Sequence, residues 1–382
     1  SSRAANAAAG AEMDVFEPHG NTRCVSRQVR VGYLSPDFNK HSVSYFTEAL
    51  LRHHSVAHFH VTCYSAASKE DATTRRLRSC ADSWFSVVGM SPLAAAQKIR
   101  ADKIDILVEL AGHTAGNRLD IMALRPAPVQ VTLIGYPNTT GLDSIQYRIT
   151  DQHADPLDTT QHFSEELVRL PETFLCYTPP DESEVGPVAP PPSASLHYVT
   201  FGTFNNVAKI NGHVVRLWAR ILLALPDSRL LLKSRAFAAK QVKDSCLCAL
   251  ADFGVDRSRI DLLQVVASTH DHMAKYARMD ISLDTFPYAG TTTTVEALLM
   301  GVPVVTLRAT GQEATHAQNV GVSLLTQVGC TELIANNEDH FVEIAVSLAR
   351  SPERMRTLRE TLRQRLLASP LCDGARYMVH VE

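Results

Sequence analysis

The chain has 382 residues, of which 45% are hydrophobic and 20% are charged, and its formal net charge at pH 7 is -3. This composition is typical of a globular protein and excludes a disordered chain. The small net charge and the lack of a basic run give no reason to expect a nucleic-acid partner, and no apolar window is long enough to cross a membrane.

Residues 1–28 read as an N-terminal tail without the apolar core of a secretory signal, so we expect an intracellular protein. The eight cysteines are scattered, and their spacing predicts neither disulfides nor a structural metal. A chain of this length is longer than one hydrophobic core usually serves, so two domains are expected.

The first half, residues 29–176, alternates short β-branched runs with helical stretches. This alternation predicts a parallel sheet covered by helices, which is a doubly wound α/β domain. In chain order we expect strands at 29–36, 58–65, 104–112 and 129–137, and helices at 42–54, 92–103 and 117–126.

Residues 177–197 are proline-rich and polar, which predicts an extended linker at a domain boundary. The alternation then restarts over residues 198–382. Because ligands of open α/β sheets bind at the carboxyl ends of the strands, two such halves predict a cleft between them. The expected strands are 198–205, 228–234, 259–266, 280–287 and 303–308, and the expected helices are 212–226, 270–279 and 292–301.

A glycine followed by four threonines lies where the strand at 280–287 gives way to a helix. A helix N-terminus presents unpaired N–H groups and a partial positive charge, which together favour an anion. Helix capping explains any one threonine equally well, but four exceed what capping needs, because β-branched residues weaken a first helical turn. We therefore expect a diphosphate to bind here, at Gly290, Thr291, Thr292 and Thr293.

Three further groups follow predicted strands of the second half. Lys209 could meet a phosphate as a point charge, although a surface lysine is the alternative. Glu296 lies four residues past Thr292 on the same helical face, within reach of a ribose hydroxyl unless it is simply solvated. His270 and His272 could suggest a metal, but without a third ligand at known spacing we favour contact with a base or phosphate.

In the first half, Asp37 and His41 follow the first predicted strand, and Glu109 and His113 follow the third. An imidazole facing a phosphate site across a cleft is placed for acid–base work or for positioning an acceptor. Each histidine could equally cap a helix. The meeting of several such loops at one cleft favours the functional interpretation.

Long ordered motifs carry a resemblance that runs from about residue 29 to about residue 373. They include "DILVELAGHTAGNRL", "RPAPVQVTLIGYPNTTGL", "FGTFNNVAKI", "LDTFPYAGTTTTVEALLMGVPVVTL" and "HAQNVGVSLL". With these motifs the chain resembles the catalytic region of family 41 glycosyltransferases, the nucleocytoplasmic protein O-glycosyltransferases. The resemblance implies a GT-B architecture, in which two Rossmann-like lobes face each other across a cleft, and inversion at the anomeric carbon without a metal or other cofactor.

Within the family the chain is more similar to the SPINDLY branch, which uses GDP-fucose, than to the O-GlcNAc transferase branch, which uses UDP-GlcNAc. The signs are "HSVSYF", "NTTGL", "FPYAGTTTT", the short proline-rich linker and Thr269, where the O-GlcNAc enzymes carry a lysine. The resemblance thus implies transfer of fucose to Ser or Thr of cytoplasmic and nuclear proteins, with O-GlcNAc transfer as the alternative.

The resemblance also implies roles for single residues. Lys209 would stabilise the leaving diphosphate, and His41 would act as a base or position the acceptor. Glu296 matches a position where a shorter aspartate holds the ribose. The implied donor-binding residues are Asn206, Val266, Ala267, Thr269, His272, Tyr288, Gly290, Thr291, Thr292, Thr293 and Glu296. The implied acceptor or cleft residues are Asp37, His113, Pro137 and Asn138.

The chain departs from the family pattern at both ends. Tandem tetratricopeptide repeats, through which a longer chain could form an oligomer, should precede residue 29, and nothing upstream has their 34-residue period. Residues 369–382 are expected to stop before the family's last helix, which crosses back to the first lobe. The alternatives are a nucleotide-sugar 2-epimerase, which needs carboxylates for proton abstraction, and a non-catalytic nucleotide-sugar-binding domain.

Overall fold

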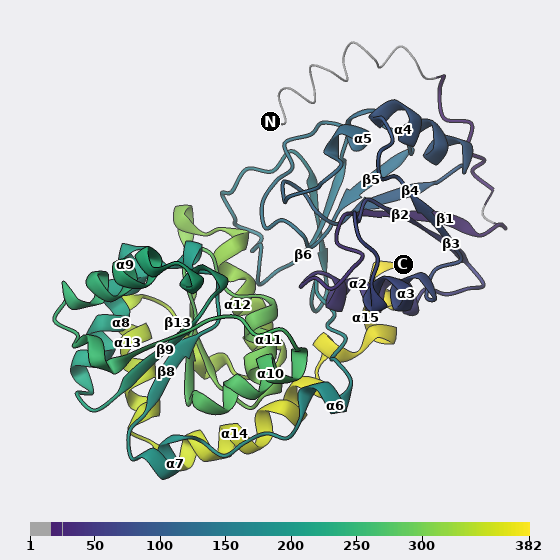
Figure 1. Ribbon diagram of the computed structural model, residues 1–382. Helices are drawn as coiled ribbons and strands as arrows, with labels where there is room; N and C mark the ends of the chain where they lie inside the picture. Colours follow the sequence, from purple (N-terminus) through teal and green to yellow (C-terminus); the bar gives the residue numbers. More distant parts are fainter. Residues whose placement is uncertain (1–16, 25) are drawn as a thin grey trace. The chain divides into compact units, whose positions relative to one another are not determined.

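The computed structural model describes residues 17–24 and 26–382, apart from the side chain of residue 313 (Figure 1). The chain divides into two compact units, each an α/β layer structure. Unit 1 contains the chain up to residue 152 together with 161–178 and 373–382. Unit 2 contains residues 153–160 and 179–372.

The described part of unit 1 has a seven-stranded parallel sheet in the order β3-β2-β1-β4-β5-β6-β7. Helices α2, α3 and α15 pack together, and α4 packs against α5. Right-handed crossovers place the two groups on opposite faces of the sheet. The strands are β1 (Val29–Ser35), β2 (Phe59–Ser65), β3 (Ser83–Ser86), β4 (Ile106–Glu109), β5 (Val129–Thr132), β6 (Tyr147–Asp151) and β7 (Glu166–Leu170), and the helices are α2 (Ser44–Arg52), α3 (Ala72–Arg78), α4 (Pro92–Ala101), α5 (Leu119–Ala123) and α15 (Gly374–Val381).

The described part of unit 2 has a six-stranded parallel sheet in the order β10-β9-β8-β11-β12-β13. Helix α8 packs against α9 and α13, and α11 packs against α12 and α14. The strands are β8 (Thr200–Thr203), β9 (Arg229–Lys233), β10 (Ile260–Leu263), β11 (Ile281–Leu283), β12 (Val304–Leu307) and β13 (Ile334–Ala335). The helices are α6 (Glu182–Val185), α7 (Ser193–Leu196), α8 (Gly212–Ala224), α9 (Lys240–Ala251), α10 (Thr269–Ala274), α11 (Thr292–Leu299), α12 (His316–Gln327), α13 (Glu338–Ala349) and α14 (Pro352–Leu367).

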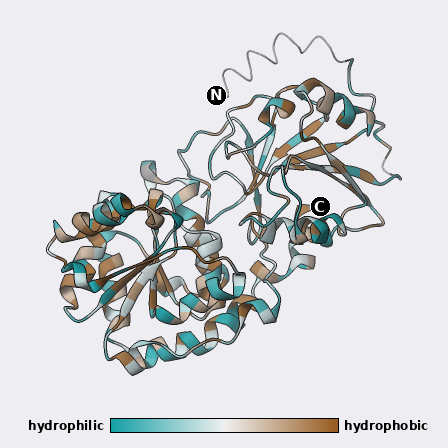
Figure 2. Ribbon diagram, viewed as in Figure 1, coloured by the Kyte–Doolittle hydropathy of each residue, from teal (hydrophilic) through white to brown (hydrophobic). Residues whose placement is uncertain are grey.

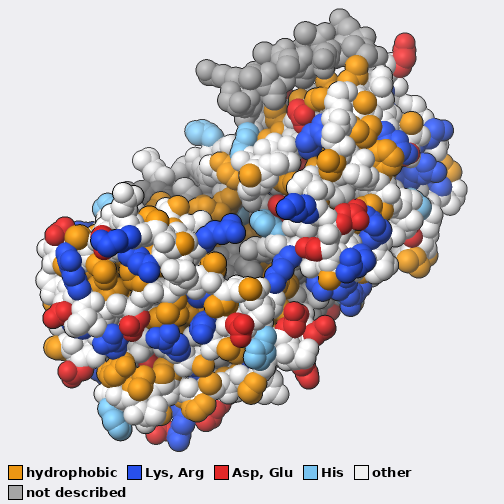
Figure 3. Space-filling model, in the orientation of Figure 1, with side chains coloured by type: hydrophobic (Ala, Val, Ile, Leu, Met, Phe, Trp, Pro, Cys, Tyr) orange, Lys and Arg blue, Asp and Glu red, His pale blue; other side chains and the backbone are white. Residues whose placement is uncertain are grey.

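Apolar side chains follow this layering, with brown strands inside each unit in Figure 2. In unit 1 a hydrophobic core lies between the sheet and α4 and α5, around Leu34, Leu107, Ile99 and Met122. In unit 2 the side chain of Trp218, on α8, is fully buried and belongs to the core beneath the layer of α8, α9 and α13. Acidic and basic side chains are interspersed on the face drawn in Figure 3. None of the helices in the described residues has the length and apolarity that a bilayer crossing requires.

The proline-rich segment 177–197 is not simply extended, as the sequence predicted, because it contains the one-turn helices α6 and α7. Tertiary hydrogen bonds hold it against unit 2. The N–H and hydroxyl of Ser193 donate to Asp280 Oδ1 at 3.1 and 2.7 Å. From α14, Arg359 donates to the carbonyl of Ala189 and Arg363 to that of Gly186. Composition predicts the break in periodicity but not these contacts.

The last helix returns to unit 1, contrary to the expectation that residues 369–382 stop before such a helix. Helix α15 packs on α2, and the Tyr377 hydroxyl donates to the carbonyl of Phe174 at 2.9 Å. Its side-chain pattern is strongly amphipathic, with Tyr377 and Met378 buried. Eight residues suffice for this helix because tertiary packing, not length, supplies its stability.

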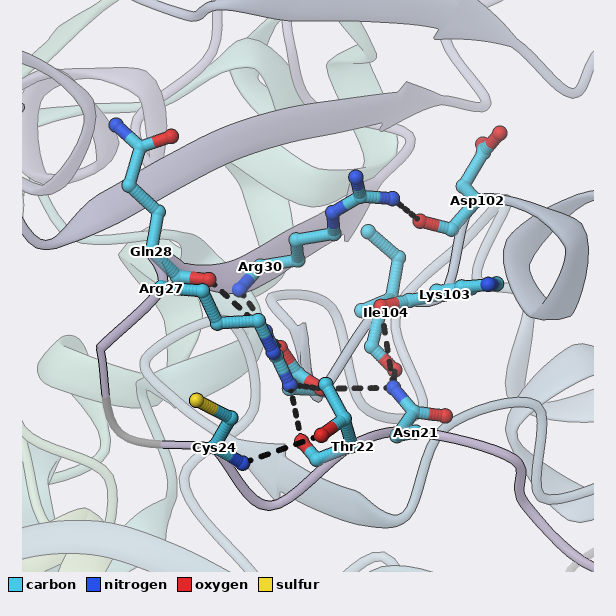
Figure 4. Close-up of polar contacts among 10 residues, drawn as sticks. Asn21, Thr22, Cys24, Arg27, Gln28, Arg30, Asp102, Lys103 and Ile104 are labelled. Atoms are coloured by element: carbon cyan, nitrogen blue, oxygen red, sulfur yellow. Dashed lines mark hydrogen bonds and ion pairs between the residues drawn. The ribbon is translucent and has the colours of Figure 1, made fainter.

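Asp105 fixes the segment before β1, and Figure 4 shows Asn21 and Arg27 of that segment among their polar contacts. This carboxylate accepts from Asn21 Nδ2 at 2.7 Å, from both terminal nitrogens of Arg27, and from the N–H of Arg30 at 2.9 Å. Burial raises the pKa of Asp105, but these hydrogen bonds outweigh burial and leave the pKa below its usual value. The first 16 residues of the expected tail lie outside the described residues.

Candidate functional site

The topological switch point of unit 2 lies between β8 and β11. From β8 the chain proceeds through β9 to β10 on one side, and it then continues through β11, β12 and β13 on the other. Ligands of open α/β sheets bind at the carboxyl ends of the strands at such a point. The loops that follow β8 and β11 therefore frame the candidate site, and the threonine run and Lys209 lie on them.

Asp284, which follows β11, organises the loop before the threonines. Its Oδ1 accepts from the N–H groups of Gly290 at 2.7 Å and Thr285 at 2.8 Å. Its Oδ2 accepts from the Thr306 hydroxyl at 2.9 Å. Burial raises the pKa of this carboxyl, and the hydrogen bonds and the charge of Lys209 oppose that shift. The buried carboxylate thus folds residues 284–290 back on themselves at the strand end.

A glycine is needed at position 290 because neighbouring atoms leave no room for a Cβ, and not because the backbone there is left-handed. A Cβ at this position would lie 2.6 Å from Thr294 Oγ1 and 2.7 Å from Thr293 Oγ1. Helix α11 begins at Thr292, and its N-cap Thr291 makes no side-chain capping hydrogen bond. The Thr293 hydroxyl donates to Asn205 Oδ1 at 2.6 Å. Side-chain capping therefore does not explain Thr291, and anion binding at the N-terminus of α11 stays a prediction.

Lys209 ends a short 3-10 helix, Val207–Lys209, and its ammonium reaches the loop after β11. Its Nζ donates to the carbonyl of Ala289 at 2.8 Å and lies 3.6 Å from the centre of the Tyr288 ring. Burial lowers the pKa of Lys209 to about 8, and the charge of Asp284 only partly opposes this shift. Asn206 caps the 3-10 helix by accepting from the N–H of Ala208 at 3.1 Å.

His272 and Glu296 meet each other at this edge of the sheet. His272 Nε2 lies 2.8 Å from Glu296 Oε2, which also accepts from the Tyr276 hydroxyl at 3.1 Å. The Tyr276 hydroxyl also lies 3.2 Å from the carbonyl of Thr293. Glu296 is only 8% exposed. Glu296 is therefore not the solvated carboxylate that the sequence left as the alternative, and any ribose contact would be shared with His272.

The remaining predicted donor residues lie around the loop after β10. Thr269 begins α10, with Ser268 as its N-cap, while Val266 is half-buried and Ala267 exposed before it. His270 is exposed, and its Nδ1 lies 3.8 Å from Asp271. Within the described ranges no group of three His, Cys, Asp or Glu side chains could hold a metal ion.

Unit 1 has its own switch point between β1 and β4, and the predicted residues follow those two strands. His41 Nδ1 lies 3.6 Å from Asp37 Oδ2 and 3.3 Å from the N–H of Val43. Burial raises the pKa of Asp37, and His41 partly opposes that shift. His41 itself is exposed before α2. The pair can hold or exchange a proton at the imidazole.

His113 belongs to a second group of unit 1 residues, which fixes the loop after β5. His113 Nε2 lies 2.8 Å from the carbonyl of Thr140. The buried Arg148 donates to the carbonyls of Asn138 at 2.8 Å and Tyr136 at 2.9 Å, on either side of Pro137. Glu109 is likewise buried and accepts from the N–H of Gly112 at 2.7 Å, so its contacts are structural.

Sequence reasoning missed four residues that build the site, namely Asn205, Lys233, Tyr276 and Asp284. Asp284 and Lys233 stand at the carboxyl ends of strand-like runs, "DISLD" and "RLLLK", and the argument applied to Lys209 would have found both. Asn205 ends the predicted strand 198–205 and carries the same signal. Tyr276 carries none, because its role depends on tertiary contacts.

Known proteins resemble this chain over nearly its whole length. Glycosyl transferase family 41 matches residues 14–178 and 194–381. A Petunia hybrida protein named probable UDP-N-acetylglucosamine–peptide N-acetylglucosaminyltransferase SPINDLY is 51% identical over 366 residues, covering 95% of this chain and 39% of that protein. The Arabidopsis thaliana protein SEC, named as a probable enzyme of the same kind, is 32% identical over 93% of this chain and 36% of its own length.

Two solved structures extend the comparison. A mutant of the Thermobaculum terrenum O-GlcNAc transferase matches with a TM-score of 0.89 and 35% identity, over 99% of this chain and 71% of that one. Sucrose-phosphate synthase from Thermosynechococcus elongatus matches with a TM-score of 0.54 and 11% identity, over 93% and 97%. Together they show the predicted GT-B architecture. The chain spans about two fifths of the length of the curated relatives it matches.

Proposed function

Because the chain belongs to glycosyl transferase family 41, we propose that it transfers a sugar from a nucleotide-sugar donor to Ser or Thr hydroxyls of proteins. The observation that carries the proposal is that Lys209 and the N-terminus of α11 both lie at the switch point of unit 2. Both groups favour negative charge, which is what a leaving nucleoside diphosphate develops. The proposal extends to cytoplasmic and nuclear protein acceptors, as the family resemblance implies.

In the proposed reaction the acceptor oxygen attacks the anomeric carbon as the bond from that carbon to the diphosphate oxygen breaks. The electron pair of the broken bond stays on the diphosphate, and the acceptor proton leaves to a base. Lys209 and the α11 N–H groups stabilise the diphosphate. Because the Lys209 ammonium is already held by the carbonyl of Ala289, little reorganisation is needed as charge develops.

The donor is the finer part of the proposal. The motifs of the SPINDLY branch support GDP-fucose, whereas the names of the SPINDLY relatives support UDP-GlcNAc. We propose GDP-fucose, with UDP-GlcNAc as the alternative. Calorimetric titration of the chain with GDP and UDP in parallel tests the choice. Tighter binding of GDP is expected, tighter binding of UDP would favour UDP-GlcNAc, and binding of neither would contradict the proposed function.

His41 is proposed to serve the acceptor, as a proton carrier or a positioning residue. Replacing His41 with Ala should lower the rate of transfer by about 10²-fold, the usual size of a general acid–base contribution. It should leave nucleotide affinity unchanged, because His41 belongs to unit 1 and the nucleotide residues to unit 2. Transfer assays and calorimetry on the same preparation check both parts. A variant with full transfer activity would exclude His41 from the reaction.

A further inference from the structure

Lys233, the last residue of β9, is an unusually placed lysine. It is only 5% exposed. Its Nζ lies 2.5 Å from His272 Nδ1 and 5.0 Å from the centre of the Phe204 ring. Lysines this deeply buried are normally paired with a carboxylate. In the described part of the chain this ammonium has no carboxylate within 4.0 Å, and Glu296 lies beyond the imidazole.

The hydrogen bonds around Lys233 have a fixed direction. An ammonium only donates, so His272 must accept at Nδ1 and carry its proton on Nε2, from which it donates to Glu296. One ammonium hydrogen is used in this way. The others have no described protein acceptor. The fold thus holds a buried positive charge with unused donors, which is an arrangement that suits a ligand acceptor.

The position of Lys233 relates it to the diphosphate site. Strand β9 adjoins β8 in the sheet, and Lys233 lies one residue beyond Leu232, the partner of Thr203. The Tyr276 hydroxyl lies within hydrogen-bond distance of Glu296 and of the Thr293 carbonyl in α11. His272 and Glu296 therefore connect Lys233, at the end of the neighbouring strand β9, to α11 and the proposed phosphate site. A nucleobase joined to the diphosphate through its ribose has the length to reach this cluster.

We propose that Lys233 recognises a carbonyl oxygen on the base of the donor nucleotide. Guanine presents O6 and uracil presents O4, whereas adenine and cytosine present amino groups at the corresponding positions. An ammonium can donate to a carbonyl but cannot accept from an amino group. Lys233 therefore selects keto bases over amino bases, and it does so whether the donor is GDP-linked or UDP-linked. This inference rests on the proposed function, since it assigns the base of the same donor.

Calorimetric titration with GDP, ADP, UDP, CDP and inorganic pyrophosphate tests the proposal. GDP is compared with ADP and UDP with CDP, so each pair contains one keto and one amino nucleotide. In the pair that binds better, the unmodified chain should bind the keto nucleotide at least tenfold more tightly than the amino nucleotide, because the amino nucleotide lacks the charge-assisted hydrogen bond. In Lys233→Met the affinity for the keto nucleotide should fall by about tenfold, and the ratio within the pair should approach one. Lys240→Met, which removes an exposed lysine of the same unit, should change neither value.

Two outcomes would overturn the proposal. If Lys233→Met weakens all four nucleotides and pyrophosphate alike, the lysine binds phosphate. If it leaves every affinity and the keto preference unchanged, the lysine is structural. Lys233→Gln offers a second variant, because its amide both donates and accepts and should let the amino nucleotides gain affinity relative to Lys233→Met. Failure of the unmodified chain to bind any nucleotide would instead contradict the proposed function itself.

Discussion

Replacing Lys209 with methionine should lower the rate of sugar transfer by about 10²-fold or more, while it stabilises the ligand-free chain. The loss of rate follows because the ammonium is positioned for the charge that develops on the leaving diphosphate. The gain in stability follows because methionine has a similar length but no charge to bury. Burial is the main cause of the low pKa of Lys209, about 8 in the folded chain.

The pH dependence of both effects has a definite sign. The folded pKa of Lys209, about 8, lies below the usual lysine value of 10.5, so between these pH values the unfolded chain holds a proton that the folded chain has lost. Stability should therefore rise with pH across this window. The lowered pKa corresponds to a penalty of roughly 3 kcal/mol for keeping Lys209 charged at neutral pH, and Lys209→Met would remove it. Transfer by the unmodified chain should fall as pH rises through about 8.

Thermal denaturation and initial-rate assays across pH 6 to 10, roughly the range that brackets this titration, measure the two effects together. Lys240→Met is the matched control, because it removes an exposed lysine and should change neither property. A Lys209→Met variant that is inactive but less stable than the unmodified chain would indicate damage to the fold. In that case the loss of activity could not be assigned to the diphosphate.

The order of elements could be predicted from the sequence where strands are apolar and helices periodic. Strands β1 and β2 match their predicted ranges within two residues at each end. Strand β3 was missed because none of its residues is buried, and β7 because its residues are exposed or half-buried outside Leu170. The amphipathic helix α14 was also missed, since its many charged residues obscure the apolar stripe.

The candidate site, like the fold, could be predicted from the sequence only in part. Lys209, Gly290 and the threonines follow from their place at strand ends, which is a local property of the sequence. The contacts of Glu296 could not be predicted in this way, because its partners His272 and Tyr276 come from another helix and a separate turn. The switch point, which brings the loops after β8 and β11 together, depends on strand order. Strand order is set by tertiary packing, so the sequence predicted the candidate residues but not their network.

Replacing Asp284 with alanine should lower the free energy of unfolding of unit 2 by roughly 3 to 5 kcal/mol, because several donors would lose a buried carboxylate. Those donors are the N–H groups of Gly290 and Thr285, the Thr306 hydroxyl and the side-chain amide of Asn205. Asp284→Asn should have a smaller effect, since its amide keeps one accepting oxygen. Nucleotide affinity should fall in both variants, because Asp284 shapes the loop that leads to the N-terminus of α11.

The two tryptophans allow the units to be followed separately, since Trp84 belongs to unit 1 and Trp218 to unit 2. In a Trp84→Phe background, urea denaturation followed by fluorescence reports the fully buried Trp218. Asp284→Ala should shift this transition to lower urea, while Asp252→Ala, which removes an exposed carboxylate of the same unit, should leave it in place. A shift in Asp284→Ala worth less than about 1 kcal/mol would mean that water replaces the lost acceptor. The loop would then owe its shape to the contacts of Gly290 with Thr293 and Thr294 instead.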